Sequence, residues 1–338
     1  MKRKLIIIII AILTAVILVA SLMALREYQE KKNQEEIDSA IHGVVIAKDT
    51  PFYLKPETEN VRQIRLLKKS DNVYILDEFE NNDIKWYKVK VDGKINGYVR
   101  AEDVDYYKEV NKEKVLVSDV SQFNSKDFET SEDYEVFLLE NKINYVYIRA
   151  GGRGYGSKGN FYEDTEYQKY IDACEYLKIP YGFYFLDEAL DDKEINEEVD
   201  FIQEFLDKHS GKYCKLPVAL DIEKHDGKGR ADDIWNERAE IVQKLINKLN
   251  RKKIDNIVYT NAQTANLYLS SLDTKFWIAY YPQDEKIPDY WYFDTKQEGA
   301  ENMELYKKTV GWQFSETGAG DEVVERVDLS LFKKEFYK

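Results

Sequence analysis

The chain has 338 residues and a formal net charge of −14, so it is long enough for two or three folded units and too acidic for a typical nucleic-acid binder. It holds only three histidines and two cysteines. Neither an HExxH motif nor a Cys/His spacing suited to zinc is present, which disfavours zinc hydrolases. We therefore expect no metal and no cofactor.

The N-terminal segment is apolar. Residues Leu5–Leu25 form a run of 21 residues without a charged side chain, and three basic residues at positions 2–4 precede it. This length spans a bilayer as a helix, and the basic flank predicts a cytoplasmic N-terminus with the remaining chain outside. We expect a retained single-pass anchor over residues 1–26, followed by a solvated stalk or short helix over 27–41. A cleaved signal peptide, cut near a small residue such as Ala24, is the alternative.

Residues 42–107 differ from the anchor in character. Short β-prone runs alternate with polar turns, at 72–76, 86–91 and 97–100 for the runs and at 81–83 and 92–93 for the turns. Many short strands in so short a segment predict a small all-β barrel or sandwich. A polar linker is predicted over 108–114.

This small segment resembles a bacterial SH3-like domain. The resemblance rests on the turn at 68–71, on Trp86-Tyr-Lys-Val89, and on Gly93 followed by Gly97-Tyr98-Val99. It implies a domain that holds peptidoglycan, usually through the peptide part. A spacer that only positions the next domain fits these residues equally well.

From Val115 onwards the pattern alternates between strands and helices. Strand-like runs occur at 115–120, 145–150, 181–186, 217–222, 257–260, 276–281 and 310–314. Apolar residues at helical spacing fall within 167–177 and 234–249, where only Arg238 is out of character. The alternation predicts an α/β domain with a mostly parallel sheet, either open or closed.

The run Leu216-Pro-Val-Ala-Leu-Asp-Ile-Glu223 ends in two carboxylates separated by one residue. Because side chains alternate along a strand, Asp221 and Glu223 are expected on the same face. Two neighbouring carboxylates do not ionise together easily, so one is expected to keep a proton near neutral pH. That pair suits the cleavage of glycosidic bonds, whereas a strand end with two solvated acids is the simpler alternative.

Further acids follow other predicted strands. Asp119 ends the first strand, and Asp187 and Glu188 follow the third. Since catalytic residues of α/β barrels lie at the carboxyl ends of the strands, these acids predict one acidic pocket. His225, close to the acid pair, is expected to be a solvated loop histidine.

Other hydrolase chemistries find little support. Cys174 lies on an apolar helical stripe, which predicts a buried free thiol, and Cys214 does not have the setting of a nucleophile either. A GxSxG elbow is absent. The glycine-rich run at 151–156 lacks the Lys-Ser/Thr of a phosphate-binding loop, so a substrate loop or a plain turn is expected there.

Residues 115–338 resemble glycoside hydrolase family 25, the lysozymes of the N-acetylmuramidase type. Seven motifs occur in the family's order: Asp119-Val-Ser121, Arg149-Ala-Gly151, Gly182-Phe-Tyr184, Leu216 to Glu223, Tyr259-Thr-Asn261 with Trp277 to Tyr281, Trp312-Gln-Phe-Ser315, and Val327-Asp-Leu329. Two departures occur. Val117-Ser118 stand where the family has Gly-Ile, and Phe185 follows Tyr184 where a histidine is common.

The resemblance implies an irregular (β/α) barrel and a set of site residues. Glu223 matches the family's general acid, and Asp221 matches the partner that orients or stabilises the reaction. Asp119 and Asp328 match further catalytic carboxylates. Residues expected to contact the sugar are Tyr184, Tyr281, Trp312 and Arg149.

The expected function is cleavage of the β-1,4 bond between N-acetylmuramic acid and N-acetylglucosamine in peptidoglycan. A non-catalytic peptidoglycan-binding module and a glycosidase acting on another acetamido polymer, such as chitin, are the alternatives. The expected partners are peptidoglycan glycan strands, the membrane through the N-terminal helix, and a cell-envelope assembly; no nucleic acid is expected. The barrel would then face the cell wall from the outer side of the cell membrane.

Overall fold

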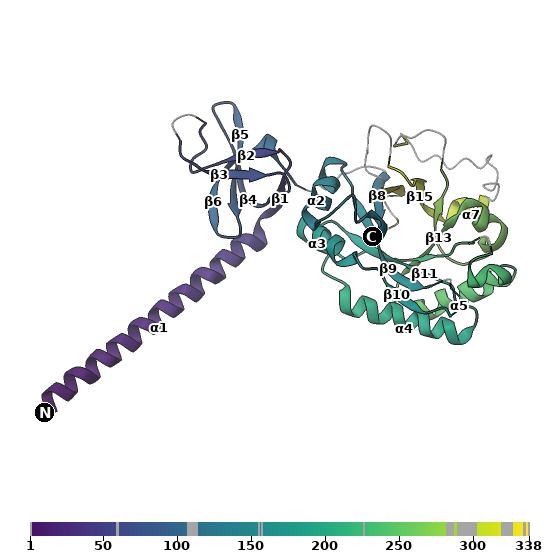
Figure 1. The fold of residues 1–338 in the computed structure, drawn as a ribbon, viewed down its shortest axis with the longest axis horizontal. Helices are drawn as coiled ribbons and strands as arrows, with labels where there is room; N and C mark the ends of the chain where they lie inside the picture. Colours follow the sequence, from purple (N-terminus) through teal and green to yellow (C-terminus); the bar gives the residue numbers. More distant parts are fainter. Residues whose placement is uncertain are drawn as a thin grey trace. The chain divides into compact units, whose positions relative to one another are not determined.

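The computed structural model describes residues 2–58, 61–106, 114–154, 156, 158–225, 227–281, 287–288, 303–318, 327–333 and 336, with backbone alone for 2–18, 114, 303, 304 and 306. The chain divides into two compact units, Met1–Tyr106 and Tyr107–Lys338 (Figure 1). The bounds predicted for the anchor, stalk and linker remain predictions.

The first unit consists of one long helix and an antiparallel β half-barrel. Helix α1 covers Lys2–Ser39. The strands are β1 (Ile41–Val45), β2 (Asp49–Tyr53), β3 (Gln63–Lys68), β4 (Asn72–Asn81), β5 (Ile84–Val91), β6 (Ile95–Arg100) and β7 (Val104–Tyr106), in the sheet order β3-β2-β6-β5-β4-β1-β7. The predicted all-β character of this segment is therefore confirmed.

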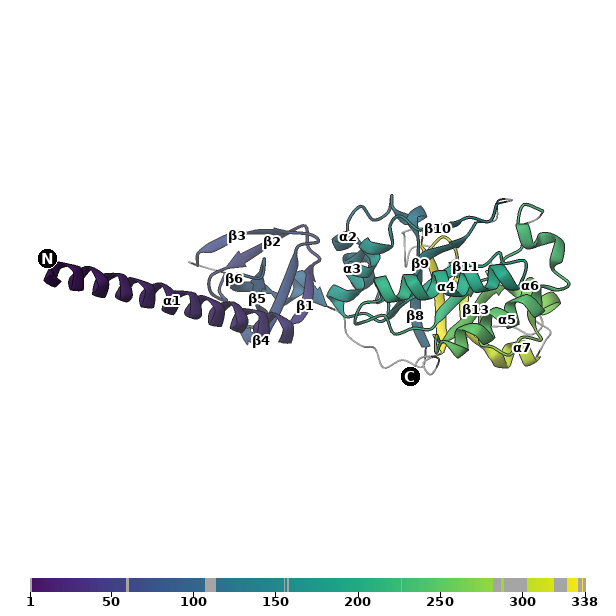
Figure 2. The ribbon, with the colours of Figure 1, turned by 90° about the horizontal axis from the view of Figure 1, so that it is seen from below.

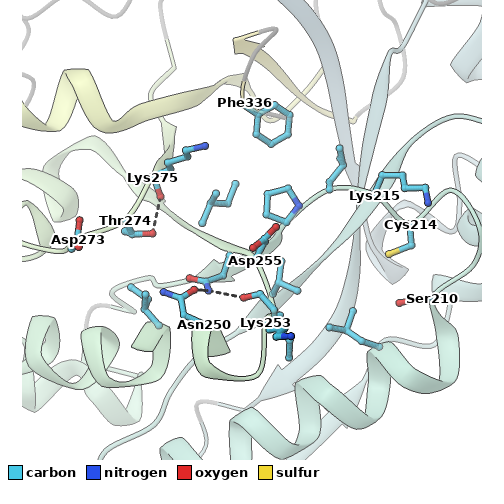
Figure 3. A pocket seen from close by; sticks show the side chains of 18 of the residues that line it. Ser210, Cys214, Lys215, Asn250, Lys253, Asp255, Asp273, Thr274, Lys275 and Phe336 are labelled. Atoms are coloured by element: carbon cyan, nitrogen blue, oxygen red, sulfur yellow. Dashed lines mark hydrogen bonds between the residues drawn. The ribbon is translucent and has the colours of Figure 1, made fainter. Parts of the chain in front are cut away.

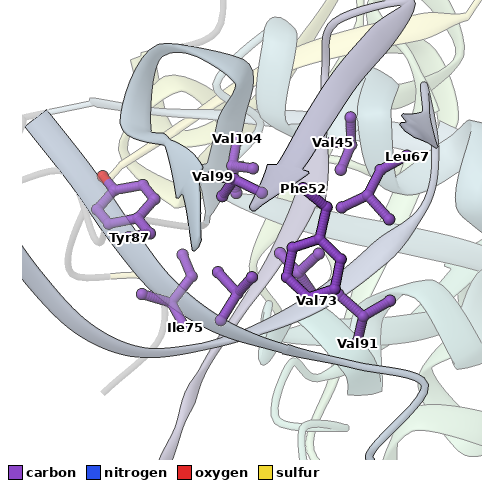
Figure 4. Close-up of a cluster of buried hydrophobic side chains, with 10 residues drawn as sticks. Val45, Phe52, Leu67, Val73, Ile75, Tyr87, Val91, Val99 and Val104 are labelled. Atoms are coloured by element: carbon purple, nitrogen blue, oxygen red, sulfur yellow. The ribbon is translucent and has the colours of Figure 1, made fainter. Parts of the chain in front are cut away.

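Turn chemistry and alternation explain why these residues form a half-barrel. The predicted turns are confirmed, because Asn82, Asp83, Asp92 and Gly93 all have positive φ, as tight two-residue hairpins require. Alternate strand residues point inward and form one core (Figure 4), made of Val45, Phe52, Leu67, Val73, Ile75, Tyr87, Val89, Val91, Val99 and Val104. Each fully buried side chain of this size contributes about 1.5–3 kcal/mol.

The last turns of helix α1 are fixed to the half-barrel. Asn33 donates a hydrogen bond to the carbonyl of Gly93 at 2.9 Å. The buried ammonium of Lys90 donates to the Asn33 side chain at 2.6 Å and pairs with Glu36. The segment predicted as a stalk or short helix therefore continues α1 as far as Ser39.

The predicted membrane anchor falls largely outside the described side chains. Most of the apolar run Leu5–Leu25 belongs to residues 2–18. Where side chains are described, the structure contains no helix with both the length and the apolar character that crossing a bilayer demands. The anchor stays a prediction.

The second unit is a closed eight-stranded barrel in which one strand runs antiparallel to its neighbours. Its strands are β8 (Lys114–Val120), β9 (Tyr145–Arg153), β11 (Tyr181–Leu186), β12 (Val218–Asp221), β13 (Asn256–Asn261), β14 (Phe276–Ala279), β15 (Thr309–Ser315) and β16 (Asp328–Lys333). Neighbours from β8 to β15 are parallel, whereas β16 runs antiparallel to both β15 and β8. Strand β10 (Phe161–Glu163) extends β9 as a hairpin outside the ring.

The helices lie outside the ring of strands (Figure 2). They are α2 (Ser131–Glu140), α3 (Tyr167–Leu177), α4 (Asp192–His209), α5 (Arg238–Arg251), α6 (Ala262–Thr264) and α7 (Met303–Lys308). Seven of the strands and the helix at 167–177 were predicted from the sequence, whereas β10 and β16 were not. The start of α5 was predicted too early, because residues 230–234 form a separate 3₁₀ turn.

Side-chain alternation in β8 sets the inner and outer faces of the barrel. Ser118 points outward, and its hydroxyl lies 2.8 Å from the Tyr134 hydroxyl on α2. Its neighbour Asp119 points inward. Below it, Val117 and Val115 belong to an interior core with Tyr147, Leu216, Ala219, Ile257, Trp277, Val310, Phe332 and Phe336.

Arg238, the one charged residue on the apolar stripe of α5, ties this helix to β11. Its guanidinium is 1% exposed and pairs with the Asp187 carboxylate at 3.0 Å. It also donates to the carbonyls of Ala189 and Asp187, each at 2.6 Å. A buried arginine is tolerated here because carboxylate and carbonyl oxygens replace its water.

We predict that Arg238→Met lowers the free energy of unfolding by about 3–5 kcal/mol, because it leaves the Asp187 carboxylate buried and unpaired. Urea denaturation measures this change. Arg251→Met, an exposed arginine at the other end of α5, is the matched control and should change stability by less than about 0.5 kcal/mol. Equal stability of the two variants would contradict a stabilising role for the buried pair.

Candidate active site

Two cavities open at opposite ends of the barrel. The one at the amino-terminal end of the strands encloses about 850 Å³ and is lined by residues such as Pro217, Asp255, Thr274 and Lys275 (Figure 3). The cavity at the carboxyl-terminal end encloses about 590 Å³ and holds all four predicted catalytic carboxylates. Because active sites of (β/α) barrels lie at the carboxyl ends of the strands, the second cavity is the candidate active site.

The lining of this cavity combines acids, aromatic rings and one arginine. The four carboxylates are Asp119, Asp221, Glu223 and Asp328. Arg149, Tyr184, Tyr259, Trp277 and Tyr281 complete the inner wall, and Phe123, Asn124 and Glu316 are among the other lining residues. A cavity of this size accommodates sugar rings, and its aromatic faces suit their apolar sides.

Strand β12 places Asp221 and Glu223 on the same side of the backbone. Asp221 is the last residue of the strand, and Glu223 follows two positions later in the loop. Ile222 between them is fully buried, while both acids line the cavity. The same-face geometry predicted from alternation is therefore confirmed.

Burial is the main reason why the pKa values of both acids are raised. Burial raises the pKa of Glu223, and the charge of nearby His225 lowers it by a smaller amount. The pKa of Asp221 lies well above its usual value, first because of burial and then because of the Glu223 charge, while Arg149 opposes the shift. The site can therefore hold a proton at near-neutral pH.

The loop that carries Glu223 is held by Asp232. The carboxylate of Asp232 accepts hydrogen bonds from the backbone N–H groups of His225 at 3.0 Å, Gly227 at 2.6 Å and Gly229 at 3.1 Å. Because three backbone donors converge on one side chain, the path of the chain after Glu223 is fixed.

Asp119 and Asp328 form a second carboxyl pair. They are direct register partners across β8 and β16, and each carboxyl group shifts the pKa of the other. Because two neighbouring carboxylates do not ionise together easily, one of them is expected to carry a proton. Burial raises the pKa of Asp119 to about 7, against the opposing hydrogen bonds from Gln313 and Asp328. Burial and the Asp119 charge raise the pKa of Asp328 well above its usual value.

Gln313 on β15 joins this pair to two tyrosines. Its amide nitrogen donates to the two Asp119 oxygens at 3.0 and 3.2 Å and to Asp328 at 3.4 Å. Its amide oxygen accepts from the hydroxyls of Tyr259 at 2.7 Å and Tyr281 at 2.8 Å. The sequence analysis missed Gln313, although a lone amide in the apolar strand 309–315 is a signal for a buried polar role.

Arg149 reaches the cavity from β9. The β9–β11 register shifts at Tyr184/Phe185, opposite Gly151, so the strand is irregular just beyond Arg149. Its guanidinium donates to the buried Asp164 carboxylate at 2.7 Å and lies 4.6 Å from the centre of the Phe123 ring. Phe123 is 76% exposed at the cavity wall and was also missed by the sequence analysis.

Trp312 is not among the described residues that line the cavity. Because Gln313 points into the barrel, its neighbour Trp312 points to the outer face, where it is 1% exposed. Its indole N–H donates to the carbonyl of Tyr280 at 2.7 Å. The sugar contact of Trp312 stays a prediction, and Trp277 is a tryptophan that lines the cavity.

Three further predictions near the site are corrected. Asp187 does not enter the acidic pocket because it pairs with Arg238. Glu188 accepts from the N–H of Ala231 at 2.9 Å and lies 3.1 Å from Nε2 of His225. His225 is thus a partly buried partner of Glu188 rather than a solvated histidine, and this contact raises its pKa.

Cys174 is buried and free, as predicted, and burial raises the pKa of its thiol well above the usual value. Within the described part of the chain, acids, histidines and cysteines form no group of three or more that could hold a metal ion.

A closed barrel with paired carboxylates at the carboxyl ends of its strands has the architecture of a glycoside hydrolase. The sequence model for glycosyl hydrolases family 25 matches residues 118–323, which is more than half of the chain. The chain therefore belongs to glycosyl hydrolases family 25.

Solved structures with a similar fold are distant in sequence. The spore cortex lytic enzyme SleM of Clostridium perfringens is 22% identical, with 67% of this chain and 69% of that chain covered and a TM-score of 0.49. The modular autolysin LytC of Streptococcus pneumoniae is 18% identical, with 77% and 58% covered and a TM-score of 0.49. The muramidase of Trichobolus zukalii is 16% identical, with 64% and 93% covered and a TM-score of 0.41. The search of curated proteins found no match.

We predict that Asp119→Asn stabilises the fold at high pH. The pKa of folded Asp119, about 7, lies above the 3.8 of an exposed aspartate, so the folded state binds the proton more tightly. This contribution to stability is complete below about pH 4 and is lost as pH rises through about 7. Because the amide carries no charge, the free energy of unfolding at pH 8 should rise by on the order of 1–4 kcal/mol.

Urea denaturation at pH 4, 6 and 8 measures this effect. The gain should be largest at pH 8 and small at pH 4. Glu204→Gln, at an exposed position of α4, serves as the control and should show no such trend. A stability difference that is the same at all three pH values would contradict the buried-charge explanation.

Proposed function

We propose that the barrel hydrolyses the β-1,4 bond between N-acetylmuramic acid and N-acetylglucosamine in peptidoglycan. Family membership supports glycoside hydrolysis. The observation that carries the proposal is a buried oxygen, Oδ1 of Asp221, for which the described residues provide no hydrogen-bond partner. The residue Asp221 lines the same cavity as Glu223, and a carboxylate with an unsatisfied oxygen suits the N–H of a 2-acetamido group.

In the proposed reaction Glu223 is the general acid. Asp221 and Glu223 both have raised pKa values and hold one proton between them; in the proposed reacting state this proton is on Glu223 and Asp221 is ionised. Glu223 gives the proton to the glycosidic oxygen as the bond from that oxygen to the sugar C1 breaks. The leaving sugar departs with a new hydroxyl group. The ionised Glu223 then takes a proton from the water that attacks C1 in the second step.

Asp221 orients the 2-acetamido group and supports its charge. When Asp221 accepts the acetamido N–H, the carbonyl oxygen of that group can attack C1 as an internal nucleophile. The ring that forms carries a positive charge, which the carboxylate of Asp221 stabilises. Water opens this ring and restores the acetamido group, so the configuration at C1 is retained.

We predict that Glu223→Gln lowers turnover of purified cell walls by roughly 10² or more, because the amide cannot protonate the leaving oxygen. Release of reducing ends measures turnover. Glu204→Gln, an exposed variant on α4, should keep the activity of the unchanged protein. Equal turnover by Glu223→Gln and the unchanged protein would remove Glu223 from this role.

The same digestion separates the alternative functions. A reducing-end N-acetylmuramic acid in the products supports the muramidase proposal, and a reducing-end N-acetylglucosamine opposes it. Cleavage of chitin in preference to peptidoglycan would favour another acetamido polymer. Binding without any cleavage would favour a non-catalytic wall-binding module, for which buried acids with raised pKa values would offer no advantage.

We also propose that the half-barrel is a bacterial SH3-like domain that holds peptidoglycan, while a spacer role remains its alternative. Its antiparallel strands and single apolar core support this assignment. Together with a membrane anchor at residues 1–26, this domain would hold the enzyme between membrane and wall, where a cell-envelope assembly could use it.

We predict that the full chain sediments with membranes and stays there after carbonate extraction, because 21 uncharged residues span the bilayer core. A chain that begins at Arg26 should stay in the soluble fraction with its activity intact. Mature protein in the medium, with a new N-terminus near Ala24, would contradict the retained anchor.

A further inference from the structure

Gln313 is the side chain that connects the two walls of the cavity by hydrogen bonds. It is 1% exposed on β15, and its amide forms hydrogen bonds with four functional groups of the site. Two of these groups, Asp119 and Asp328, are acids on β8 and β16. The other two, Tyr259 and Tyr281, are hydroxyls on and after the parallel strands β13 and β14.

The acids decide which way the amide faces, because an ionised carboxylate only accepts hydrogen bonds whereas a tyrosine hydroxyl can donate or accept. The N–H bonds of Gln313 therefore point to the acids, and both tyrosine hydroxyls donate to the amide oxygen. In the opposite orientation the amide oxygen would face two carboxyl groups that lie within 3.0–3.4 Å of the nitrogen position. That orientation would repel an ionised carboxylate.

The contacts of the amide nitrogen are unequal. It approaches both oxygens of Asp119, at 3.0 and 3.2 Å, but only one oxygen of Asp328, at 3.4 Å. Hydrogen bonds to an ionised acceptor are the stronger ones, so the closer acid is the better place for the negative charge. The proton between the two acids then belongs to Asp328, which donates to Asp119.

We propose that Gln313 is a positioning residue that gives the Asp119–Asp328 pair one defined charge state, with Asp119 ionised and Asp328 protonated. This inference rests on the proposed function, in which a positively charged sugar forms in the same cavity. A single fixed negative charge on Asp119 stabilises that sugar, whereas two ionised acids would repel each other and two protonated acids would give no charge.

The charge state of the pair also depends on other groups around it. From β12 and its loop come Asp221 and Glu223, and Glu316 follows β15. Further groups that line the same cavity are Lys126 and Asp127 after β8, Arg149 on β9, Tyr184 on β11, Tyr259 on β13 and Tyr281 after β14. Replacing Gln313 also removes the acceptor of the Tyr259 and Tyr281 hydroxyls, but this loss is the same at every pH at which both hydroxyls are neutral. The pH-dependent part of the change therefore reports on the acids.

The test is a pH-dependent double-mutant cycle on the full chain. Gln313→Met keeps the volume of the side chain but removes its hydrogen bonds. If Gln313 stabilises ionised Asp119, the variant should lose more stability at pH 8 than at pH 5, because ionisation of Asp119 is then harder. In an Asp119→Asn background this pH-dependent part should disappear. A loss of equal size at both pH values, or one that persists in that background, overturns the proposal.

Kinetics supply the second readout. Gln313→Met should lower kcat by about 10- to 100-fold, the scale of a hydrogen bond to a charged group, with little change in KM. In an Asp328→Asn background the acid is replaced by a permanently neutral donor, so the same replacement of Gln313 should cost less than about threefold. Equal losses in both backgrounds would make Gln313 a packing residue and overturn the proposal.

Two controls cover a Gln313→Met variant that does not fold and a protein that does not cleave peptidoglycan. If Gln313→Met does not fold, Tyr281→Phe removes one of the two clamping hydroxyls from a ring that is 42% exposed. It should produce a smaller pH-dependent loss of the same sign, and its absence overturns the proposal. If the unchanged protein does not cleave peptidoglycan, the proposed function fails, while the stability cycle still decides the role of Gln313.

Discussion

The antiparallel strand β16 is the constraint on which the candidate site depends. It closes the barrel between β15 and β8, and its register places Asp328 directly opposite Asp119. Two acids at adjacent backbone positions cannot move apart, so they must share a proton instead of ionising together. Closure by one reversed strand therefore brings a residue near the C-terminus to the first strand of the barrel and also sets the charge of the cavity wall.

Burial gives the other carboxylates their properties. Asp221 and Glu223 lie at the end of the short strand β12, and the loss of water around them is the largest cause of their raised pKa values. Burying these acids costs free energy, which contacts in the surrounding structure offset. Arg238 ties α5 to the carbonyls after β11, and Asp232 holds the loop after Glu223, so the acids cannot relax toward solvent.

Much of this arrangement could be predicted from the order of residues. The shared face of Asp221 and Glu223 could be predicted from the apolar run that ends in these residues, since alternation along a strand is a local property. The positive-φ turns of the half-barrel were likewise local. The face of β15 on which Trp312 lies could not be predicted, because it depends on the barrel around the strand. The predictions for Asp187, Glu188 and His225 failed because their partners, Arg238 and Ala231 among them, come from distant segments.

The sequence by itself determined the alternation of strands and helices, the position of the acids at strand ends and the family resemblance, because these depend on neighbouring residues. Only the tertiary structure decided that the sheet closes, that β16 is reversed, and that Gln313 links two acids to two tyrosines. Those features arise from contacts between residues that are far apart in the sequence; Gln313 and Asp119, for example, are 194 positions apart. The order of residues along the chain does not show which distant side chains become buried together. It therefore cannot show which of them share a proton or a hydrogen bond.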